Sequence, residues 1–390
     1  MLLFTRGAMG FQFQSIAAFG PLIGRDLALT PGQTGGLIGM YLLPGAVMAI
    51  PGSVLGQWLG GKRAALVALA LMGAGGFALA ASASFAEAAL ARLAAGAGMV
   101  LLNVLLTKMV ADRFRGRESA TAMALLLVMW PVGIALALAT LGGLASATSW
   151  RVAANVTGAW PLAALIGMAA LYADMTQPAE AERPAAALSR APAPGAMSAI
   201  RPRVARTILL GSAAGLAWTP YNCGFTALIS FTPALLAFRG ASLAQAGLIS
   251  SFIVWGAMAG TPSGGVFADA TRKPRPLVLF ASLSGAALIA LAYAGNSIVH
   301  LFAMGFCVCL PTGPLMAMLG EALPERERGL GYGVLLSWYY LGVGATPALA
   351  GLLQEWTGTP ESILPLSAAL VLATFPAYWG FHRLLRQLQG

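Results

Sequence analysis

The stretch TPGQTGGLIG at Thr30–Gly39 returns in altered form as SLAQAGLISS at Ser242–Ser251, 212 residues later in the chain. Several chemically matched pairs share this offset: Thr30 and Ser242, Gln33 and Gln245, Gly35 and Gly247, Phe19 and Phe231, Pro21 and Pro233, Ser53 and Gly265, and Gln57 and Asp269. An offset of about 210 aligns the stretch after Ala111 with that after Glu321. The chain is therefore predicted to fold as two equivalent halves.

The composition places these halves in a lipid bilayer. The 390 residues are 58% hydrophobic and only 9% charged, which is more apolar than a soluble domain of this size. Apolar runs recur at 1–24, 33–57, 62–82, 86–110, 118–145, 151–173, 206–230, 243–268, 275–294, 297–319, 329–354 and 361–384. Most are long enough to cross a bilayer as a helix, which takes roughly 20 residues. We expect an all-α integral membrane protein with twelve transmembrane helices in two pseudo-symmetric six-helix bundles.

The formal net charge of +10 suggests nucleic-acid binding, but the positions of the charges argue against it. Most Lys and Arg residues lie in the even-numbered loops or the tail, whereas only Arg25, Arg151 and Arg239 lie in odd-numbered loops. Such an asymmetry follows the positive-inside rule of membrane proteins. It predicts a multi-pass protein of the cytoplasmic (inner) membrane with both termini in the cytoplasm and no nucleic-acid partner.

One long polar stretch, rich in Ala and Pro, separates the halves. We predict an N-terminal bundle at 1–173, a cytoplasmic linker at 174–205 and a C-terminal bundle at 206–390. Prolines within spans can kink helices, and the run Trp218–Gly224, which contains Pro220, is the predicted site of a broken helix. The first apolar run starts at Met1 without a hydrophilic lead, so we expect the native start to lie upstream.

Two six-helix halves joined by a linker resemble the major facilitator superfamily over the whole chain. The loop after the second helix in that family reads roughly G-x-L-x-D-R-x-G-R-K. Here Ser53–Arg63 reads SVLGQWLGGKR, with Gln57 in place of the usual Asp. The second copy, GVFAD at Gly265–Asp269, keeps the Asp, and Arg272 and Lys273 follow it. The resemblance implies a gating charge network formed by Gln57, Lys62, Arg63, Asp269, Arg272 and Lys273.

Further runs support the resemblance. RLAAGAG from Arg92 is similar to the R-x-x-x-G-x-G element of the fourth helix in this superfamily. Within it, RGAMGFQFQS at Arg6–Ser15, LIGMYLLPG at Leu37–Gly45 and WPVG at Trp130–Gly133 are similar to the cyanate and nitroimidazole transporter group. The fold implied is one in which two bundles rock about a central site in alternating access.

Arg6 and Arg92 are the two charged residues that fall inside spans. A charge in a membrane costs at least about 2.5 kcal/mol at the centre, so it commonly marks a function. An Arg fork binds a planar oxyanion through two hydrogen bonds. Arg6 is therefore a candidate anion site, although it could equally anchor the helix at the interface. For Arg92 a structural or gating role between helices is favoured.

All thirteen acidic residues fall in loops or at span ends, so no carboxylate is expected in mid-membrane. A cation transporter needs such a carboxylate, and a proton-coupled transporter commonly uses one. The pattern favours an anionic or neutral substrate, and a proton could still travel on the substrate itself.

Polar and aromatic side chains within spans complete the predicted substrate site: Arg6, Gln12, Asn103, Trp130, Tyr221, Asn222 and Tyr340. In the superfamily, helices 1, 4, 7 and 10 line the cavity, which favours Gln12, Asn103 and Asn222. The alternative for each amide is a hydrogen bond between helices. Aromatic residues near span ends commonly form an interface belt, which fits Trp130 and Tyr340 less well because they lie mid-span.

The sequence contains no P-loop, no nucleophile or zinc signature and no C-x-x-C pair, so we expect no enzyme activity and no cofactor or metal. We favour a monomeric secondary transporter of a small organic or inorganic anion. Two alternatives stay open. One is efflux of neutral or aromatic drug-like compounds, and the other is a receptor or scaffold that keeps the fold without transport.

Overall fold

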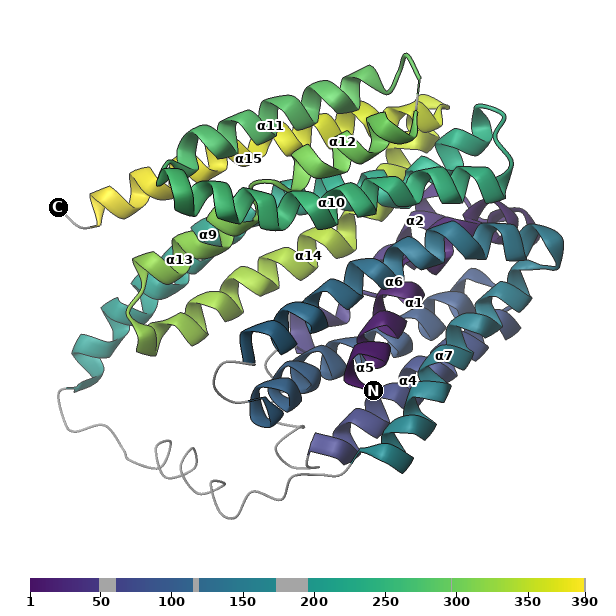
Figure 1. Cartoon of the computed structure of the whole chain (residues 1–390), viewed down its shortest axis with the longest axis horizontal. Coiled ribbons are helices and arrows are strands. Elements are labelled where there is room, and N and C mark those ends of the chain that lie inside the picture. Colours follow the sequence, from purple (N-terminus) through teal and green to yellow (C-terminus); the bar gives the residue numbers. More distant parts are fainter. Residues whose placement is uncertain (49–60, 115–118, 173–195, 296, 389–390) are drawn as a thin grey trace.

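The computed structural model describes residues 1–48, 61–114, 119–172, 196–295 and 297–388, and in these residues the regular structure is helical throughout (Figure 1). The helices of the first half are α1 (Leu2–Asp26), α2 (Pro31–Gly39), α4 (Gly61–Ala81), α5 (Phe85–Arg113), α6 (Ser119–Ala147) and α7 (Trp150–Leu171). Those of the second half are α9 (Ala196–Phe238), α10 (Leu243–Thr271), α11 (Pro274–Leu291), α12 (Ile298–Cys309), α13 (Thr312–Ala322), α14 (Glu325–Thr357) and α15 (Ile363–Gln387), with a short 3-10 helix at Pro360–Ser362.

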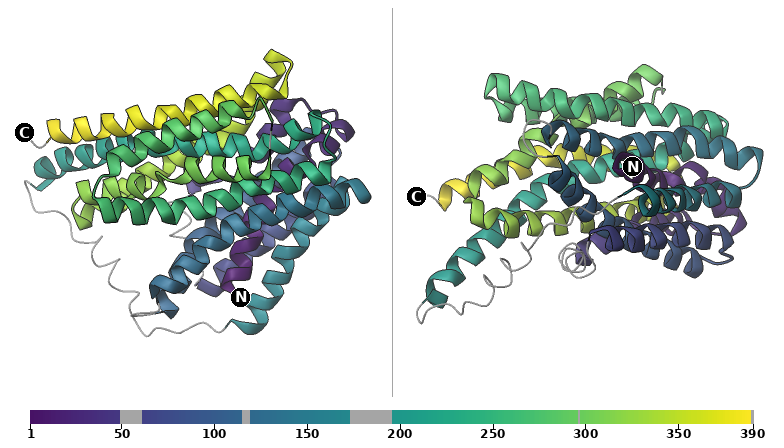
Figure 2. Two further views of the ribbon diagram at one scale, coloured as in Figure 1. Left: turned by 45° about the horizontal axis from the view of Figure 1, so that its top comes forward. Right: turned by 60° about the horizontal axis from the view of Figure 1, so that its bottom comes forward.

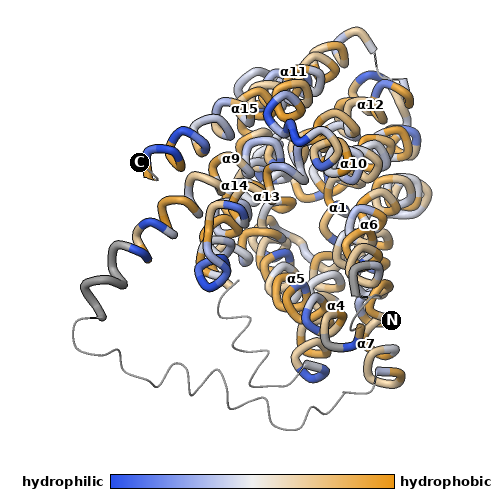
Figure 3. The backbone as a smooth tube through the Cα atoms, turned by 60° about the vertical axis from the view of Figure 1, so that its left-hand side comes forward, coloured by the Kyte–Doolittle hydropathy of each residue, from blue (hydrophilic) through white to orange (hydrophobic). Residues whose placement is uncertain are grey.

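Nine helical segments of the described residues are long and apolar enough to cross a membrane, and α12 and α13 together form one of them. Helices α1 and α14, of 25 and 33 residues, are also long enough but more polar. Figure 3 shows that hydrophilic residues lie mainly at the ends of the helices. The predicted all-α membrane fold of two six-helix bundles is confirmed.

Each half forms its own bundle (Figure 1 and Figure 2). In the first, α1 packs on α6 and α4 packs on α5 and α7; in the second, α9 packs on α14 and α15, and α10 on α12. The bundles meet mainly where α2 crosses α14 and where α6 crosses α10. They converge at the end that holds the α1–α2 and α9–α10 turns and diverge toward the N- and C-termini. We call the end where the bundles converge the closed end, and the end where they diverge the open end.

The repeated stretch encodes the same helix start in both halves. Thr30 accepts a hydrogen bond from the backbone N–H of Gln33, and the Gln33 side chain accepts one from the N–H of Thr30. Ser242 and Gln245 form the same reciprocal pair at the start of α10. This capping box satisfies backbone donors that a helix N-terminus leaves open. The repeat therefore fixes where α2 and α10 begin at the closed end.

Repeat-related glycines then let the bundles meet backbone to backbone. A Cβ at Gly35 or Gly39 of α2 would overlap the carbonyl oxygens of Pro347 and Gly344 of α14. A Cβ at Gly247 of α10 would likewise overlap the Leu138 carbonyl of α6. Lipid tails are as apolar as the helices, so close packing of small residues takes the place of a hydrophobic drive. Glycine is thus required at these contacts.

Polar contacts supplement this packing at the closed end. Glu355 of α14 accepts a hydrogen bond from the backbone N–H of Gly32 at 2.6 Å, which ties one bundle to the start of α2 in the other. Two of the arginines in odd-numbered loops are paired within their bundles: Arg151 with Asp26 at 3.1 Å and Arg239 with Glu361 at 2.6 Å. Their positive charge is therefore locally compensated.

Helix breaks occur where proline or close packing requires them. Phe19 has non-helical torsion angles two residues before Pro21, and Leu310 and Pro311 separate α12 from α13. The predicted break at Trp218–Gly224 is wrong, because α9 is continuous from Ala196 to Phe238. Proline is tolerated in a membrane helix whose neighbours hold it in place, and α9 packs on both α14 and α15.

Arg92 of α5 links its helix to α1 and α2 through hydrogen bonds. It is only 1% exposed, and its guanidinium donates to the carbonyl oxygens of Leu37, Gln12 and Phe13 at 2.8–2.9 Å. The group also lies over the Tyr41 ring, at 4.6 Å. All three nitrogens are satisfied by main-chain groups of α1 and α2, so the charge of α5 joins three helices of one bundle.

We expect Gly39→Ala to open the closed end, because the added methyl group overlaps the Gly344 carbonyl. Overpacking of this kind costs about 1–3 kcal/mol. The measurement is the distance between spin labels at Ala83 and Trp356, on opposite bundles, in a chain with its three cysteines replaced. Gly36→Ala is the matched control, since a Cβ there meets nothing within 4 Å. Equal distances in both variants would contradict the packing argument.

We expect Arg92→Met to lower the thermal unfolding midpoint in detergent, because it removes hydrogen bonds from a charged group worth about 1.5–3 kcal/mol each. Arg326→Met removes an exposed charge and should leave the midpoint nearly unchanged. The structural role of Arg92 is refuted if the two variants unfold at the same temperature.

Candidate functional site

Arg6 lies on α1 in an environment that differs from that of Arg92. It is 9% exposed, and its Nη1 donates a short hydrogen bond to the Oδ1 atom of Asn103 on α5. Its Cζ atom lies 5.4 Å from the ring centroid of Trp130 on α6. The Nε atom is buried without a hydrogen-bond partner. The hydrogen-bonding capacity of this guanidinium is therefore not fully used by the residues that the structure describes.

The Arg6 cluster reaches the second bundle through Asn103. The Asn103 Nδ2 atom donates to the Tyr340 hydroxyl of α14 at 3.1 Å, and the rings of Tyr339 and Tyr340 lie 5.2 Å apart in an edge-to-face arrangement. The predicted residues Arg6, Asn103, Trp130 and Tyr340 are thus brought together from four helices. We call these four residues the central cluster.

Local glycines explain how Trp130 comes to lie beside Arg6. A Cβ at Gly10 of α1 would overlap the Trp130 carbonyl, and one at Gly133 of α6 would overlap the Gly7 carbonyl. The α1 and α6 backbones can therefore touch, which brings the Trp130 ring to the Arg6 side chain. The Phe13 ring stacks on the Trp130 ring, with 5.7 Å between the two ring centroids.

Three predicted substrate residues lie elsewhere. Gln12 is buried inside the first bundle, where its amide donates to the carbonyls of Met72 and Thr157 and accepts from the Tyr41 hydroxyl. Tyr221 is 3% exposed in the core of the second bundle, and the Asn222 amide donates to the Trp218 carbonyl of its own helix. These contacts match the alternative in which polar groups join or stabilise helices.

Two polar residues near the centre were absent from the predicted site. Gln14, fully buried on α1, donates to the Ile229 carbonyl of α9 at 2.7 Å and so links the two bundles. Tyr339 packs beside Tyr340. The sequence signal was present in the Q-x-Q and W-Y-Y runs, but neither run reveals which member faces the other bundle.

Of the predicted gating residues that the structure describes, all but Arg92 lie at the open end. Lys62, at the start of α4, donates to the Ala169 carbonyl at 3.0 Å, and Arg63 is exposed. Asp269 and Arg272, at the end of α10, line a cavity of about 650 Å³ together with Glu321. Lys273 is exposed beside them, and Gln57 lies outside the described residues.

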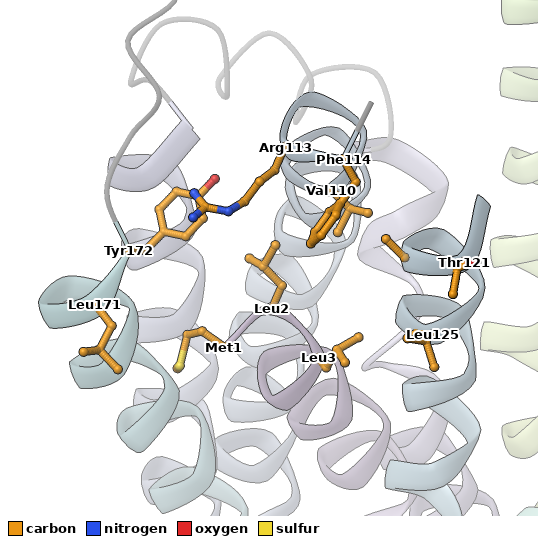
Figure 4. Close-up of a pocket in the computed structure, with 11 residues that line it drawn as sticks. Met1, Leu2, Leu3, Val110, Arg113, Phe114, Thr121, Leu125, Leu171 and Tyr172 are labelled. Atoms are coloured by element: carbon orange, nitrogen blue, oxygen red, sulfur yellow. The ribbon is translucent and has the colours of Figure 1, made fainter. Parts of the chain in front are cut away.

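An apolar cavity lies apart from the central cluster (Figure 4). It measures about 600 Å³ and lies within the first bundle, at the open ends of α1, α5, α6 and α7. Leu2, Leu3 and Val110 line it, and Arg113 extends across it toward Tyr172, with 6.0 Å from its Cζ to the ring centroid. Because it joins no residues of the second bundle, it is a poor candidate for an alternating-access site.

Comparison with known proteins supports a transporter. A 3-(3-hydroxy-phenyl)propionate transporter of Escherichia coli (strain K12) is 30% identical over 370 residues, covering 90% of this chain and 85% of the relative. A D-xylose-proton symporter structure has a TM-score of 0.75 at 14% identity, covering 97% of this chain and 96% of its own. A nucleoside transporter structure has a TM-score of 0.71 at 12% identity, with 98% of both chains covered. Likeness at this low identity supports the fold alone.

The profile of the Major Facilitator Superfamily matches residues 2–295 and 219–386. These ranges span nearly the whole chain and both bundles, and the relative found by sequence is itself a transporter. The chain therefore belongs to the major facilitator superfamily and is a membrane transporter rather than an enzyme.

Proposed function

We propose that this transporter moves a small organic anion across the cytoplasmic membrane, and that an aromatic carboxylate is the favoured class. The observation that carries the proposal is the buried Nε atom of Arg6, which has no partner in a site joined to both bundles. A carboxylate is planar and accepts two parallel hydrogen bonds from a guanidinium. In a low-dielectric site such a contact is strong.

The aromatic part of the substrate would lie among Trp130, Tyr339 and Tyr340. Aromatic rings prefer offset or edge-to-face neighbours, and these side chains present both faces and hydroxyls. The E. coli relative is named for a compound with a phenol ring and a carboxylate. That pairing of chemical groups suits an arginine beside aromatic side chains, which supports the same class here.

Sidedness and gating are part of the proposal. The described basic residues of the even-numbered loops, such as Lys62, Arg113 and Arg272, lie at the open end. By the positive-inside rule this end would face the cytoplasm, and the structure would then represent an inward-facing state. When this end closes, the predicted gating residues would approach one another: Lys62, Arg63, Asp269, Arg272 and Lys273.

The resemblance to cyanate and nitroimidazole transporters agrees with an anionic substrate, because cyanate is a small anion that Arg6 could bind. We expect the protein to work as a monomer.

Efflux of neutral compounds is the competing function. It would leave the Arg6 charge and its free donor buried without compensation, which is costly in a membrane. The two functions differ in what must stabilise the protein: a carboxylate in one, and a neutral aromatic compound in the other.

We expect 3-(3-hydroxyphenyl)propionate to raise the thermal unfolding midpoint of the purified protein, by about 2.7 kcal/mol of stability at 100 times its dissociation constant. Arg6→Gln should weaken binding about 10- to 100-fold, since a hydrogen bond to a charged group is worth about 1.5–3 kcal/mol. Arg326→Gln removes an exposed charge and is the matched control. An equal shift with the neutral amide of the same acid would refute the anion proposal.

Trp130→Leu should weaken binding of the aromatic acid about 2- to 10-fold, because an aromatic pair contributes about 0.5–1.5 kcal/mol. Acetate, which lacks the ring, should lose little. Competition of both acids against a labelled aromatic acid measures the two effects. Trp356→Leu, at a side chain that is 91% exposed, serves as control. A loss of the same size for both acids would mean that Trp130 only positions Arg6.

A further inference from the structure

The central cluster contains a positive charge and no negative one. Arg6 contacts an amide, an indole ring and, through Asn103, a phenol. The ion pairs of the described residues lie elsewhere, at the closed end. The titratable group that reaches this cluster by hydrogen bonding is the Tyr340 hydroxyl, and tyrosine is ordinarily neutral below about pH 10.

No acidic residue that the structure describes is paired with Arg6. Every acidic residue of the sequence lies in a predicted loop or at a span end. The described acids near helix ends have partners or exposure there: Asp26 pairs with Arg151, Glu361 with Arg239, and Glu355 bonds to Gly32. Arg6 must therefore obtain its negative partner from solution.

Arg92 is a buried arginine whose hydrogen bonds are all made within the protein. Its three nitrogens bind three carbonyls of α1 and α2, within the bundle that carries it. Rocking of the bundles leaves those contacts intact. Arg6 differs because its cluster spans both bundles and its Nε donor is buried without a hydrogen-bond partner. Its surroundings must change each time the bundles move.

An alternating-access cycle passes through a state in which both ends are closed. In that state Arg6 loses contact with water from either side, and an unpaired charge in such a place is strongly unfavourable. A bound carboxylate removes the penalty by pairing with the guanidinium. The loaded transporter should therefore cross this state much more readily than the empty one.

We propose that the protein is an anion exchanger, in which import of one organic anion is completed by export of another on the same arginine. The inference rests on the proposed function, because it requires that Arg6 bind the transported anion. One monovalent anion leaves for each that enters, so no net charge moves and no proton is needed.

Proteoliposome uptake tests the exchange directly. Labelled 3-(3-hydroxyphenyl)propionate is added to vesicles that contain either the unlabelled acid or an isosmotic neutral sugar, with the membrane potential clamped. We expect uptake at least about tenfold faster into acid-loaded vesicles, a ratio that corresponds to about 1.4 kcal/mol. Equal rates into both, or sugar-loaded vesicles filling as fast once an inward proton gradient is applied, would overturn the exchange. No uptake and no thermal shift with this acid would instead overturn the proposed function.

A substitution that supplies the missing charge gives an independent test. Asn103→Asp places a carboxylate on Arg6, so the empty transporter should interconvert without an anion while binding of the acid is lost. Spin labels at Ala83 and Trp356 should then show both open and closed distances in the absence of the acid. In the parent chain the acid should be required for the second distance. Asn155→Asp, an exposed residue of α7, is the matched control. A parent chain that populates both distances equally without the acid would contradict the inference.

Discussion

Backbone contact at glycine is the constraint on which this structure depends. Within a bilayer, helices gain nothing by hiding apolar surface from one another, so association relies on close packing and on polar contacts. Gly10 and Gly133 join α1 to α6, and Gly35, Gly39 and Gly247 join the two bundles. The same small residues that hold the bundles together at the closed end therefore determine that the central cluster lies at their junction.

The two buried arginines illustrate opposite uses of a charge in this setting. Arg92 is saturated by main-chain oxygens of α1 and α2 and adds rigidity to one bundle. Arg6 has a buried Nε donor without a partner, and it lies beside an aromatic ring and an amide that reaches the other bundle. Arg92 therefore has a structural role, whereas Arg6 is the residue on which the proposed anion site depends.

The fold could be predicted because its signals are distributed along the chain. Span lengths, the charge asymmetry and the repeat at Thr30 and Ser242 each depend on local sequence, and the capping boxes at Gln33 and Gln245 explain why that repeat is visible. The site was predicted less completely. Gln12 and Gln14 are two residues apart on α1, yet one bonds within its bundle and the other across the interface. The rotation of α1 about its axis and the identity of its neighbouring helices decide that difference. Neither can be predicted from the sequence of α1 alone.

The two halves share their glycine packing but differ in the polar groups that they contribute. The glycine contacts of α2 with α14 and of α10 with α6 are related by the repeat, so packing treats the two interfaces alike. The polar groups do not follow this symmetry. Glu355 bonds to the start of α2, whereas the repeat-related position on α6 is Gly143, which has no side chain that could bond to the start of α10. Arg6 and Trp130 belong to the first bundle, and Tyr340, which is joined to Arg6 through Asn103, belongs to the second. A substrate with a carboxylate at one end and a ring at the other would contact both bundles at once, and such a ligand favours the state in which they are closest.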